Sequence, residues 1–289
     1  MSGFDPAWLR VREPFDDKAR SLALADRFVA SLGDAPTVID LGGGSGANLR
    51  HLAPRLGDEQ HWIVYDNDPV LLESLISETA QWAEEHGWKF KTAGREDCVV
   101  KGEGRRIEVH YEVLDLATNL PDVVFDAATG ITGSALLDLA SAAWLDELAT
   151  AIHRNGLPVL FALSFDGRMT WQPPAGDDAL IREAFVAHQR TDKGFGGPSL
   201  GPEAVGHLAK ALRAPGWSVA TAMSDWHIAP GDAAMLTAML DGVGKAALEA
   251  RPGDLEAIDR WLAGRRADLE AGRLDLAVGH VDLLALPLP

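Results

Sequence analysis

The sequence has few cysteines and few cationic residues. Its single cysteine, Cys98, excludes an intrachain disulfide framework, a cysteine-held iron–sulfur cluster and a multi-cysteine zinc site, so we interpret it as a free thiol. Lysine and arginine total 26 against 43 aspartates and glutamates, which gives a net charge of −17 at pH 7. Such a field repels phosphate backbones, and we therefore expect no nucleic-acid partner.

Long hydrophobic segments are also missing. No apolar run reaches the roughly 18–20 residues that a membrane span needs, and the opening MSGFDPAWLRVREPFDD is too charged for a secretory signal. We therefore expect a cytoplasmic protein without a membrane partner, as a monomer or a homodimer. Hydrophobic residues make up 47% of the 289, which indicates a globular chain with one large domain or a core with an insertion.

Short apolar strands alternate with helical patterns along the chain. We expect helices over residues 5–33, 47–56, 69–82, 135–154, 177–189, 202–213 and 231–270. We expect strands over residues 37–41, 61–66, 107–114, 123–131, 157–164, 217–223 and 276–286, a loop or weak strand over 87–105, and irregular structure over 166–200. This alternation predicts an α/β fold with a doubly wound, mostly parallel seven-stranded sheet, covered by helices on both faces.

The most informative segment is VIDLGGGSGAN, residues 38–48, where the first strand turns into a helix. Glycines permit positive φ and close approach of a ligand, and a helix N-terminus presents free amides, so we expect a carboxylate-bearing or negative ligand there. The dinucleotide pattern G-x-G-x-x-G/A is met by Gly42, Gly44 and Ala47. A second pattern, D-x-G-x-G-x-G, is met by Asp40, Gly42, Gly44 and Gly46.

With an acid ending its first strand, the sequence resembles the class I S-adenosylmethionine-dependent methyltransferases. Further blocks resemble a bacterial, small-molecule group of this class: WLRVREP (8–14), NLRHL (48–52), QHW (60–62), ALLDL (135–139) and HQRTDKG (188–194). The resemblance implies a Rossmann-like sheet whose last strand is antiparallel and lies beside the fifth. It also implies methyl transfer from S-adenosylmethionine to a small-molecule acceptor, at oxygen or nitrogen, with S-adenosylhomocysteine as the product.

The resemblance also implies roles for the residues that follow the first strands. Asp66 would accept hydrogen bonds from both ribose hydroxyls, with Asn67 beside the adenine. Asp115 would accept a bond from the adenine amino group, with Leu116 or Ala117 packing on the ring; as an alternative, Asp115 is a helix cap or a loop acid. The remaining predicted cofactor residues are Asp40, Gly42, Gly44, Gly46, Asn48, Thr132 and Gly133.

Arg12 has two interpretations. Its guanidinium can donate two parallel hydrogen bonds to the methionyl carboxylate of the cofactor, or it forms an ordinary ion pair with Glu13 or Asp16.

The acceptor is expected at the end of the fourth strand, residues 129–134, where Ser134 would contact it. This stretch lacks the Asp/Asn-Pro-Pro-Tyr/Phe signature of enzymes that methylate nucleobase or glutamine nitrogens. Asp138 is a candidate general base or a structural acid in an apolar helix. His188, beside a glycine-rich turn, belongs either to a catalytic lid or to a solvated helix end.

Three further side chains are candidates for contact with the acceptor: Arg168, Trp171 and Arg190. Arg168 and Trp171 follow the fifth strand and suit an anionic or aromatic molecule. Arg190, like His188, belongs either to a lid or to a solvated helix end. No H-E-x-x-H or H-x-x-x-H spacing occurs, so we expect no metal site, and no G-x-S-x-G motif supports a hydrolase.

The predicted organisation is a single methyltransferase domain over 1–289. It comprises an N-terminal helical lid (1–34), a cofactor-binding core (35–165) and helical additions near the acceptor edge (166–216 and 230–272). Two other functions stay open: a protein that binds S-adenosylmethionine without turnover, and an NAD(P)-dependent oxidoreductase.

Overall fold

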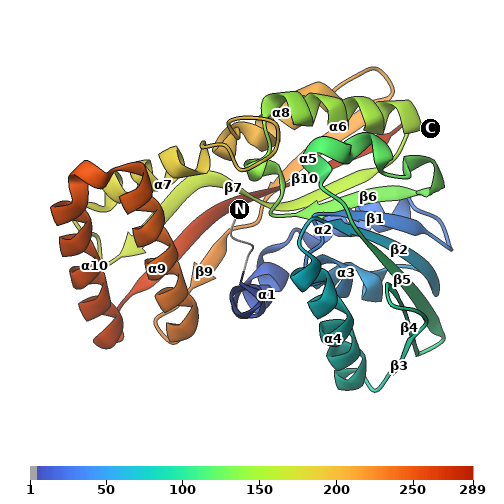
Figure 1. Ribbon diagram of the computed structural model, residues 1–289, viewed down its shortest axis with the longest axis horizontal. Coiled ribbons are helices and arrows are strands. Elements are labelled where there is room, and N and C mark those ends of the chain that lie inside the picture. The colour runs from blue at the N-terminus through green and yellow to red at the C-terminus, as the bar shows by residue number, and fades with distance from the viewer. Residues whose placement is uncertain (1–4, 289) are drawn as a thin grey trace.

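One sheet runs through the part of the chain that the computed structural model describes, residues 5–288 (Figure 1). Within those residues ten strands pair in the order β3-β4-β5-β2-β1-β6-β7-β10-β8, and β9 pairs with the first part of β10. The strands are β1 (Thr37–Leu41), β2 (Glu59–Asp66), β3 (Lys89–Thr92), β4 (Asp97–Gly102), β5 (Arg105–Val113), β6 (Gly130–Ser134), β7 (Val159–Gln172), β8 (Trp217–Met223), β9 (Trp226–Ile228) and β10 (Asp275–Pro287).

The last strand, β10, runs against both of its neighbours. Strands β5, β2, β1, β6 and β7 are parallel, whereas β10 lies between β7 and β8 and is antiparallel to each. In the dinucleotide-binding fold the sixth strand lies directly beside the fifth. Here β10 separates β7, the fifth of the parallel strands along the chain, from β8. The predicted doubly wound, mostly parallel sheet with an antiparallel last strand is therefore confirmed, and it is the fold of class I methyltransferases.

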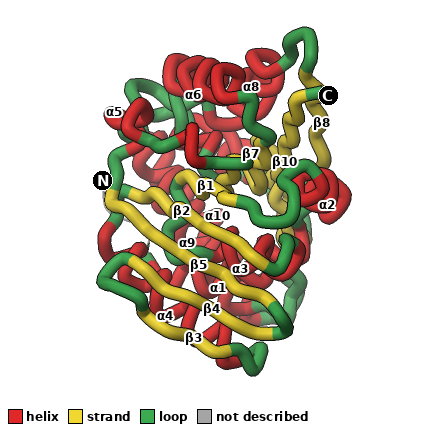
Figure 2. The backbone as a smooth tube through the Cα atoms, turned by 90° about the vertical axis from the view of Figure 1, so that its right-hand side faces the viewer, coloured by secondary structure: helices red, strands yellow, loops and turns green. Residues whose placement is uncertain are grey.

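The sheet also has strands that were not predicted. β3 and β4 form an antiparallel hairpin that extends the sheet beyond β5, as Figure 2 shows. Of the two alternatives for residues 87–105, a loop or a weak strand, the structure shows strand at residues 89–92 and 97–102. The predicted strand over 123–131 is wrong: this stretch forms a 3-10 turn at Phe125–Ala127, and the strand begins only at Gly130.

Helices cover both faces of the sheet. The helices are α1 (Pro6–Ala19), α2 (Leu22–Ala30), α3 (Ala47–Leu52), α4 (Pro69–Glu85), α5 (Leu116–Asn119), α6 (Ala142–Asn155), α7 (Asp178–Gln189), α8 (Ala204–Leu212), α9 (Ala233–Ala250) and α10 (Leu255–Glu270). In Figure 1, α6 and α8 lie above the sheet, and α2, α3 and α4 lie below it.

Local signals in the sequence set several helix ends. Asp68 accepts hydrogen bonds from the amides of Val70 and Leu71 at the start of α4, and Pro69 occupies the first turn. Helix α6 starts at Ala142, not at 135, because Ser141 caps it. The residues before that cap, Leu137–Leu139, form a 3-10 turn instead of the predicted helix.

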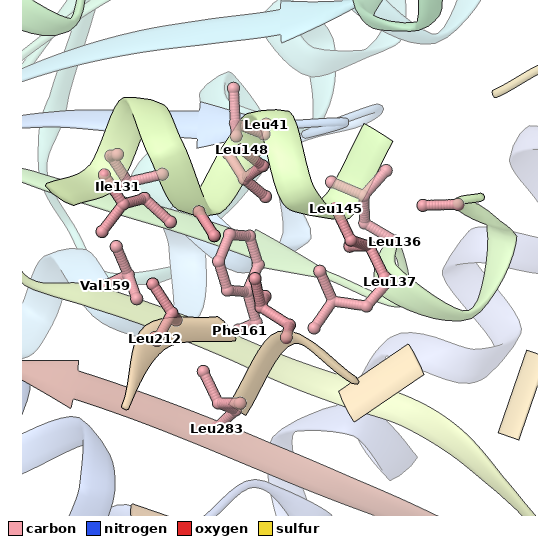
Figure 3. Close-up of a cluster of buried hydrophobic side chains, with 14 of the residues drawn as sticks. Leu41, Ile131, Leu136, Leu137, Leu145, Leu148, Val159, Phe161, Leu212 and Leu283 are labelled. Atoms are coloured by element: carbon pink, nitrogen blue, oxygen red, sulfur yellow. The ribbon is translucent and has the colours of Figure 1, made fainter. Parts of the chain in front are cut away.

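The hydrophobic core above the sheet joins five strands, β1, β2, β6, β7 and β10, to α6 and α8. Figure 3 shows Phe161 of β7 among leucines from these helices. Other strands contribute Leu41, Ile131 and Leu283, all fully buried. A second core below the sheet packs Phe28 of α2 with side chains of α3 and α4. These two layers hold the carboxyl ends of the parallel strands in fixed positions.

Strands β7 and β10 continue past the core and carry a second group of helices. Residues 275–278 of β10 pair with residues 169–172 of β7, so the irregular structure predicted from residue 166 is wrong for residues 166–172. Helices α7, α9 and α10 pack on this extension, at the left of Figure 1. Their core is rich in tryptophan, and Trp171 and Trp261 meet edge to face with ring centroids 5.3 Å apart.

Helices α1 and α2 occupy the segment predicted as an N-terminal lid, of which residues 1–4 lie outside the described residues. Their role as a lid stays a prediction, as do the other segment boundaries. Among the described helices none combines the length and the apolar character needed to cross a membrane.

Candidate active site

A cleft of about 890 Å³ lies at the carboxyl ends of the parallel strands. One side is lined by the turns that follow β1, β2, β5 and β6, and α1 contributes Leu9, Arg12, Asp16 and Arg20. The opposite side, here called the far wall, consists of residues 188–195 together with residues 242–249 of α9. The volume lies near the top of the range of about 300–1,000 Å³ for small-molecule pockets.

The glycine turn after β1 has a backbone that only glycine adopts readily. Gly42, Gly44 and Gly46 have φ of +66°, +51° and +82°, which is the left-handed region. The amides of Gly42 and Gly43 donate to the carbonyl of Tyr65 at 2.8 and 3.2 Å, so β2 holds the turn from beneath. Gly42 and Gly44 line the cleft, and Gly46 lies behind them at the start of α3.

Asp66 ends β2 and is oriented by two backbone amides. Its Oδ2 accepts from the amide of Gly44 and its Oδ1 from the amide of Asp68, each at 2.9 Å. Burial raises the pKa of Asp66 despite these bonds. Each carboxylate oxygen retains a lone pair. Asp66 lines the cleft and can therefore accept two further hydrogen bonds from a ligand, and Asn67 lines the cleft next to it.

A buried polar network lies directly behind the glycine turn. The amide nitrogen of Asn48 donates to Asp40 Oδ1 at 2.8 Å and to Thr132 Oγ1 at 3.0 Å. Its amide oxygen accepts from Arg20. Asp40 is fully buried, and this desolvation raises its pKa from 3.8 to about 7. Asn48 and Arg20 line the cleft, so the network reaches from its surface into the sheet.

Four of the predicted cofactor residues lie behind the cleft instead of lining it: Asp40, Gly46, Thr132 and Gly133. A Cβ at Gly133 would lie 2.9 Å from the carbonyl oxygen of Leu41, so close strand packing requires this glycine. In this arrangement the four support the turn from behind, and their predicted contact with a ligand stays a prediction.

Arg20 is a residue that the sequence analysis missed. It lines the cleft and is 5% exposed. Its guanidinium donates to Asn48 Oδ1 and, at 3.0 Å, to Ser134 Oγ. Among the described residues, no carboxylate forms an ion pair with Arg20, and its Nε has no hydrogen-bond partner. No sequence motif surrounds Arg20. It is a candidate only because the folded chain buries it in the cleft at the end of α1.

Arg12 lines the same cleft but is already paired. Its guanidinium contacts both oxygens of Asp16 at 3.0 and 3.2 Å, and it lies 5.0 Å from the ring centre of Trp226. Of the two interpretations of Arg12, the structure shows the ion pair with Asp16.

The turn after β5 contributes less than predicted. Asp115 is exposed and accepts a bond from the amide of Ala117 at 3.1 Å, so it is the helix cap that the sequence left open. It is not among the residues that line the cleft, whereas its neighbours Leu114 and Leu116 are. The predicted packing surface for a ring is therefore present at Leu116, without an adjacent carboxylate facing the cleft.

Polar residues from three segments meet on the far wall. His188, in the last turn of α7, contacts Glu249 of α9 through Nε2 at 3.0 Å. Its Nδ1 lies 3.2 Å from the Nζ of Lys193. Apolar neighbours Leu136, Leu139 and Phe195 line the cleft beside them. Ser134 also lines the cleft, where its hydroxyl is bound to Arg20.

Asp138 lies in the 3-10 turn behind these apolar residues. It is 5% exposed, and desolvation raises its pKa to about 6. Its Oδ1 has no partner among the described residues. Asp138 is not in the lining of the cleft, so its predicted contact with the acceptor has no support in this arrangement.

The three other predicted acceptor residues lie elsewhere. Arg168 and Arg190 line a second hollow of about 480 Å³. Arg168 bridges Asp166 and Asp225. Arg190 pairs with Glu203. Trp171 is buried against Trp261. None of the three lines the main cleft. Strand β7 carries Arg168 and Trp171 away from it for seven residues after Phe165, and the predicted contact of these residues with the acceptor finds no support there.

Within residues 5–288 no group of three or more histidine, cysteine, aspartate or glutamate side chains is arranged to hold a metal ion.

Comparisons with known proteins return solved structures only. No family model and no curated protein matches the chain. One similar structure is a SAM-dependent methyltransferase from Geobacter sulfurreducens in complex with S-adenosyl-L-homocysteine, 17% identical over 99% of this chain and 100% of that chain, with a TM-score of 0.44. Another is a cyclopropane-fatty-acyl-phospholipid synthase-like protein from Lactobacillus casei, 15% identical over 94% and 98%, with a TM-score of 0.47.

A third similar structure is geranyl diphosphate C-methyltransferase from Streptomyces coelicolor, in complex with Mg²⁺, geranyl diphosphate and S-adenosyl-L-homocysteine. It is 13% identical over 92% of this chain and 80% of that chain, with a TM-score of 0.43. The assignment of the fold depends on the strand order of this chain and not on these likenesses.

The burial of Asp40 predicts a particular pH dependence of stability. Its pKa is about 7 in the folded protein, against an ordinary value of 3.8 for an aspartate, so the folded state binds the proton more tightly. The free energy of unfolding should therefore fall as pH rises from 3.8 to about 7. Asp40→Asn removes this contribution and should show a flatter dependence in urea titrations across that window.

Asp126→Asn, at an exposed position, is the matched control and should follow the wild type. Asp138 contributes a slope of the same sign up to about pH 6, so the difference between Asp40→Asn and wild type is the quantity to compare. Parallel curves for these two proteins would contradict the burial of an ionisable Asp40.

Proposed function

We propose that this protein transfers a methyl group from S-adenosylmethionine to a small-molecule acceptor, at an oxygen or a nitrogen. The observation that carries the proposal is the joint position of the glycine turn and Asp66 in one cleft, where the amide of Gly44 donates to the carboxylate of Asp66. The sequence resemblance and the antiparallel insertion of β10 support the same cofactor class, and the insertion disfavours a dinucleotide-binding fold.

The residues on the near side of the cleft fit the parts of S-adenosylmethionine. Asp66 has acceptor capacity for two ribose hydroxyls, and Leu116 offers an apolar surface for the adenine. When bound, the cofactor supplies an electrophilic methyl group on a cationic sulfur. Transfer of that group is a displacement at carbon, which depends on alignment and on exclusion of water.

Arg20 is the residue that we propose binds the methionyl carboxylate. A buried guanidinium without a carboxylate partner is costly, so the position favours an anionic ligand. Asp40 does not neutralise it fully, because Asn48 stands between the two groups and burial raises the pKa of Asp40 to about 7. Arg12 is less suitable for this role, since Asp16 already occupies its guanidinium.

The far wall would then receive the acceptor. Both ring nitrogens of His188 are engaged, by Glu249 and by Lys193, so His188 is better suited to hold these neighbours than to take a proton. Asp138 lies behind the apolar residues that line the cleft. We therefore assign proton removal neither to Asp138 nor to His188, the two predicted catalytic residues. Binding of S-adenosylmethionine without turnover would be recognised if no acceptor released S-adenosylhomocysteine.

Changes in the glycine turn and at Asp66 test the cofactor site. Gly44→Val forces a β-branched side chain into φ of +51° at the cleft surface, and Asp66→Ala removes the two ribose acceptors. We expect each change to raise the dissociation constant for S-adenosylmethionine by about tenfold or more, measured by calorimetry.

Two variants serve as matched controls. Gly87→Val introduces the same strain at φ of +69°, at a position where an added Cβ meets nothing within 4 Å, and Asp126→Ala removes an exposed aspartate. Both should keep wild-type affinity. Unchanged affinity in Gly44→Val and Asp66→Ala would refute the assignment of the site.

Arg20→Met tests the carboxylate contact separately. The variant should bind S-adenosylmethionine about tenfold more weakly. It should bind 5′-methylthioadenosine, which has no amino-acid part, as tightly as wild type does. Arg12→Met is the matched control and should change the affinity for S-adenosylmethionine less. Equal loss of affinity for both ligands in Arg20→Met would show that Arg20 only supports the fold of the cleft.

A further inference from the structure

The far wall of the cleft holds an ammonium group with donors to spare. Lys193 is half-buried and lines the cleft. A lysine ammonium has three N–H donors, and one of them reaches His188 Nδ1 at 3.2 Å. Among the described residues no carboxylate lies within ion-pair distance of Lys193, and no other side chain accepts a bond from it. Two donors are thus free for a ligand.

The surroundings hold this ammonium in place. Glu249 contacts His188 Nε2 at 3.0 Å, which leaves Nδ1 as the atom that accepts from Lys193. The Lys193 segment is itself anchored, because the ring of Phe195 packs edge-on against Trp144 with centroids 5.2 Å apart. The amide of Gly194 also donates to Asp192 Oδ1 at 2.7 Å. The lysine is therefore positioned by its neighbours and is not a freely rotating surface side chain.

The position of Lys193 separates it from the proposed cofactor contacts. It belongs to the group formed by α7 and α9, which Figure 1 shows on the side of the molecule opposite α3 and α4. Beside it the lining of the cleft is apolar, with Phe195 and Ala246 on the far wall and Leu136 and Leu139 in the segment that follows β6. A molecule bound there would meet the ammonium of Lys193 and an apolar surface, with the carboxylates of Asp192 and Glu249 on the same wall.

We propose that the far wall binds a small organic anion, with its carboxylate or phosphate on Lys193 and its apolar body against Leu139 and Phe195, and that this anion is the methyl acceptor. The last clause rests on the proposed function; the anion site does not. A net charge of −17 makes a locally held cation necessary for such a ligand. Partial burial strengthens the attraction between the ammonium and the anion, because water screens this attraction less. The same burial lowers the pKa of Lys193.

Other cationic side chains near this region are less suited to bind the anion. Arg168 and Arg190, in the second hollow, are each paired with a carboxylate and are largely exposed. Lys245 lines the main cleft as well, but 74% of its side chain is exposed and Glu249 lies 4.0 Å away. Lys245 is therefore the matched control for Lys193, with the same charge, in the same cleft, without the burial.

The experiment compares benzoate, phenyl phosphate and neutral benzamide as probes, by ligand-observed NMR titration of the full chain with and without S-adenosylhomocysteine. For wild type, at least one of the two anions should bind about tenfold more tightly than benzamide. Lys193→Met should abolish that preference, Lys193→Arg should keep most of it, and Lys245→Met should leave it unchanged. The preferred anion then distinguishes a carboxylate from a phosphate ligand.

Several results would overturn the proposal. Benzamide could bind as tightly as the anions, all three probes could fail to bind, or Lys245→Met could lose as much preference as Lys193→Met. Weaker binding of S-adenosylhomocysteine in Lys193→Met, matching the loss for benzoate, would place Lys193 on the cofactor instead. Absence of S-adenosylhomocysteine binding in wild type, with the Lys193-dependent anion preference intact, would refute the proposed function and leave the anion site standing.

Discussion

The parallel pairing of β1 with β2 on one side and with β6 on the other determines where ligands can bind. The chain leaves β1 toward β2 and later crosses to β6, so the turns after these strands separate and open a crevice at their carboxyl ends. The hydrogen bond from Gly44 to Asp66 closes the floor of that crevice by joining the turns after β1 and β2. The proposed ligand contacts all lie around the crevice that these two turns form.

The far wall depends on a different feature, the length of β7 and β10. These strands pair along nearly their whole length and extend the sheet beyond the core, where α7 and α9 pack on them. Their helices bring His188, Lys193 and Glu249 opposite the glycine turn. The cleft therefore has one side made by the strand ends of the core and one side made by the extension, and each side has its own cation without a carboxylate partner.

Much of the near side could be predicted from sequence because it depends on local patterns. The glycines at positive φ, Asp66 at a strand end and Pro69 at a helix start all follow from short-range rules. What the sequence could not show was burial. Asp40 and Thr132 have the right positions in the chain, but their side chains face into the sheet, and Arg20 has no pattern around it yet lies in the cleft.

The far side was harder to predict because it depends on pairings between distant segments. The continuation of β7 past Phe165 requires residues 275–278 of β10 as partners, more than a hundred positions away. This continuation carries Arg168 and Trp171 away from the cleft. Lys193 lies within the block HQRTDKG, but that block did not mark it as a site residue, since its contact with His188 and its place opposite the glycine turn arise only in the folded chain.

The central claim is that the cleft binds S-adenosylmethionine. Calorimetric titration of the purified protein with S-adenosylmethionine, S-adenosylhomocysteine and NADH tests it most directly. The account predicts saturable binding of the first two at one site per chain, with no heat from NADH. Binding of NADH, or silence for both S-adenosyl compounds, would contradict it.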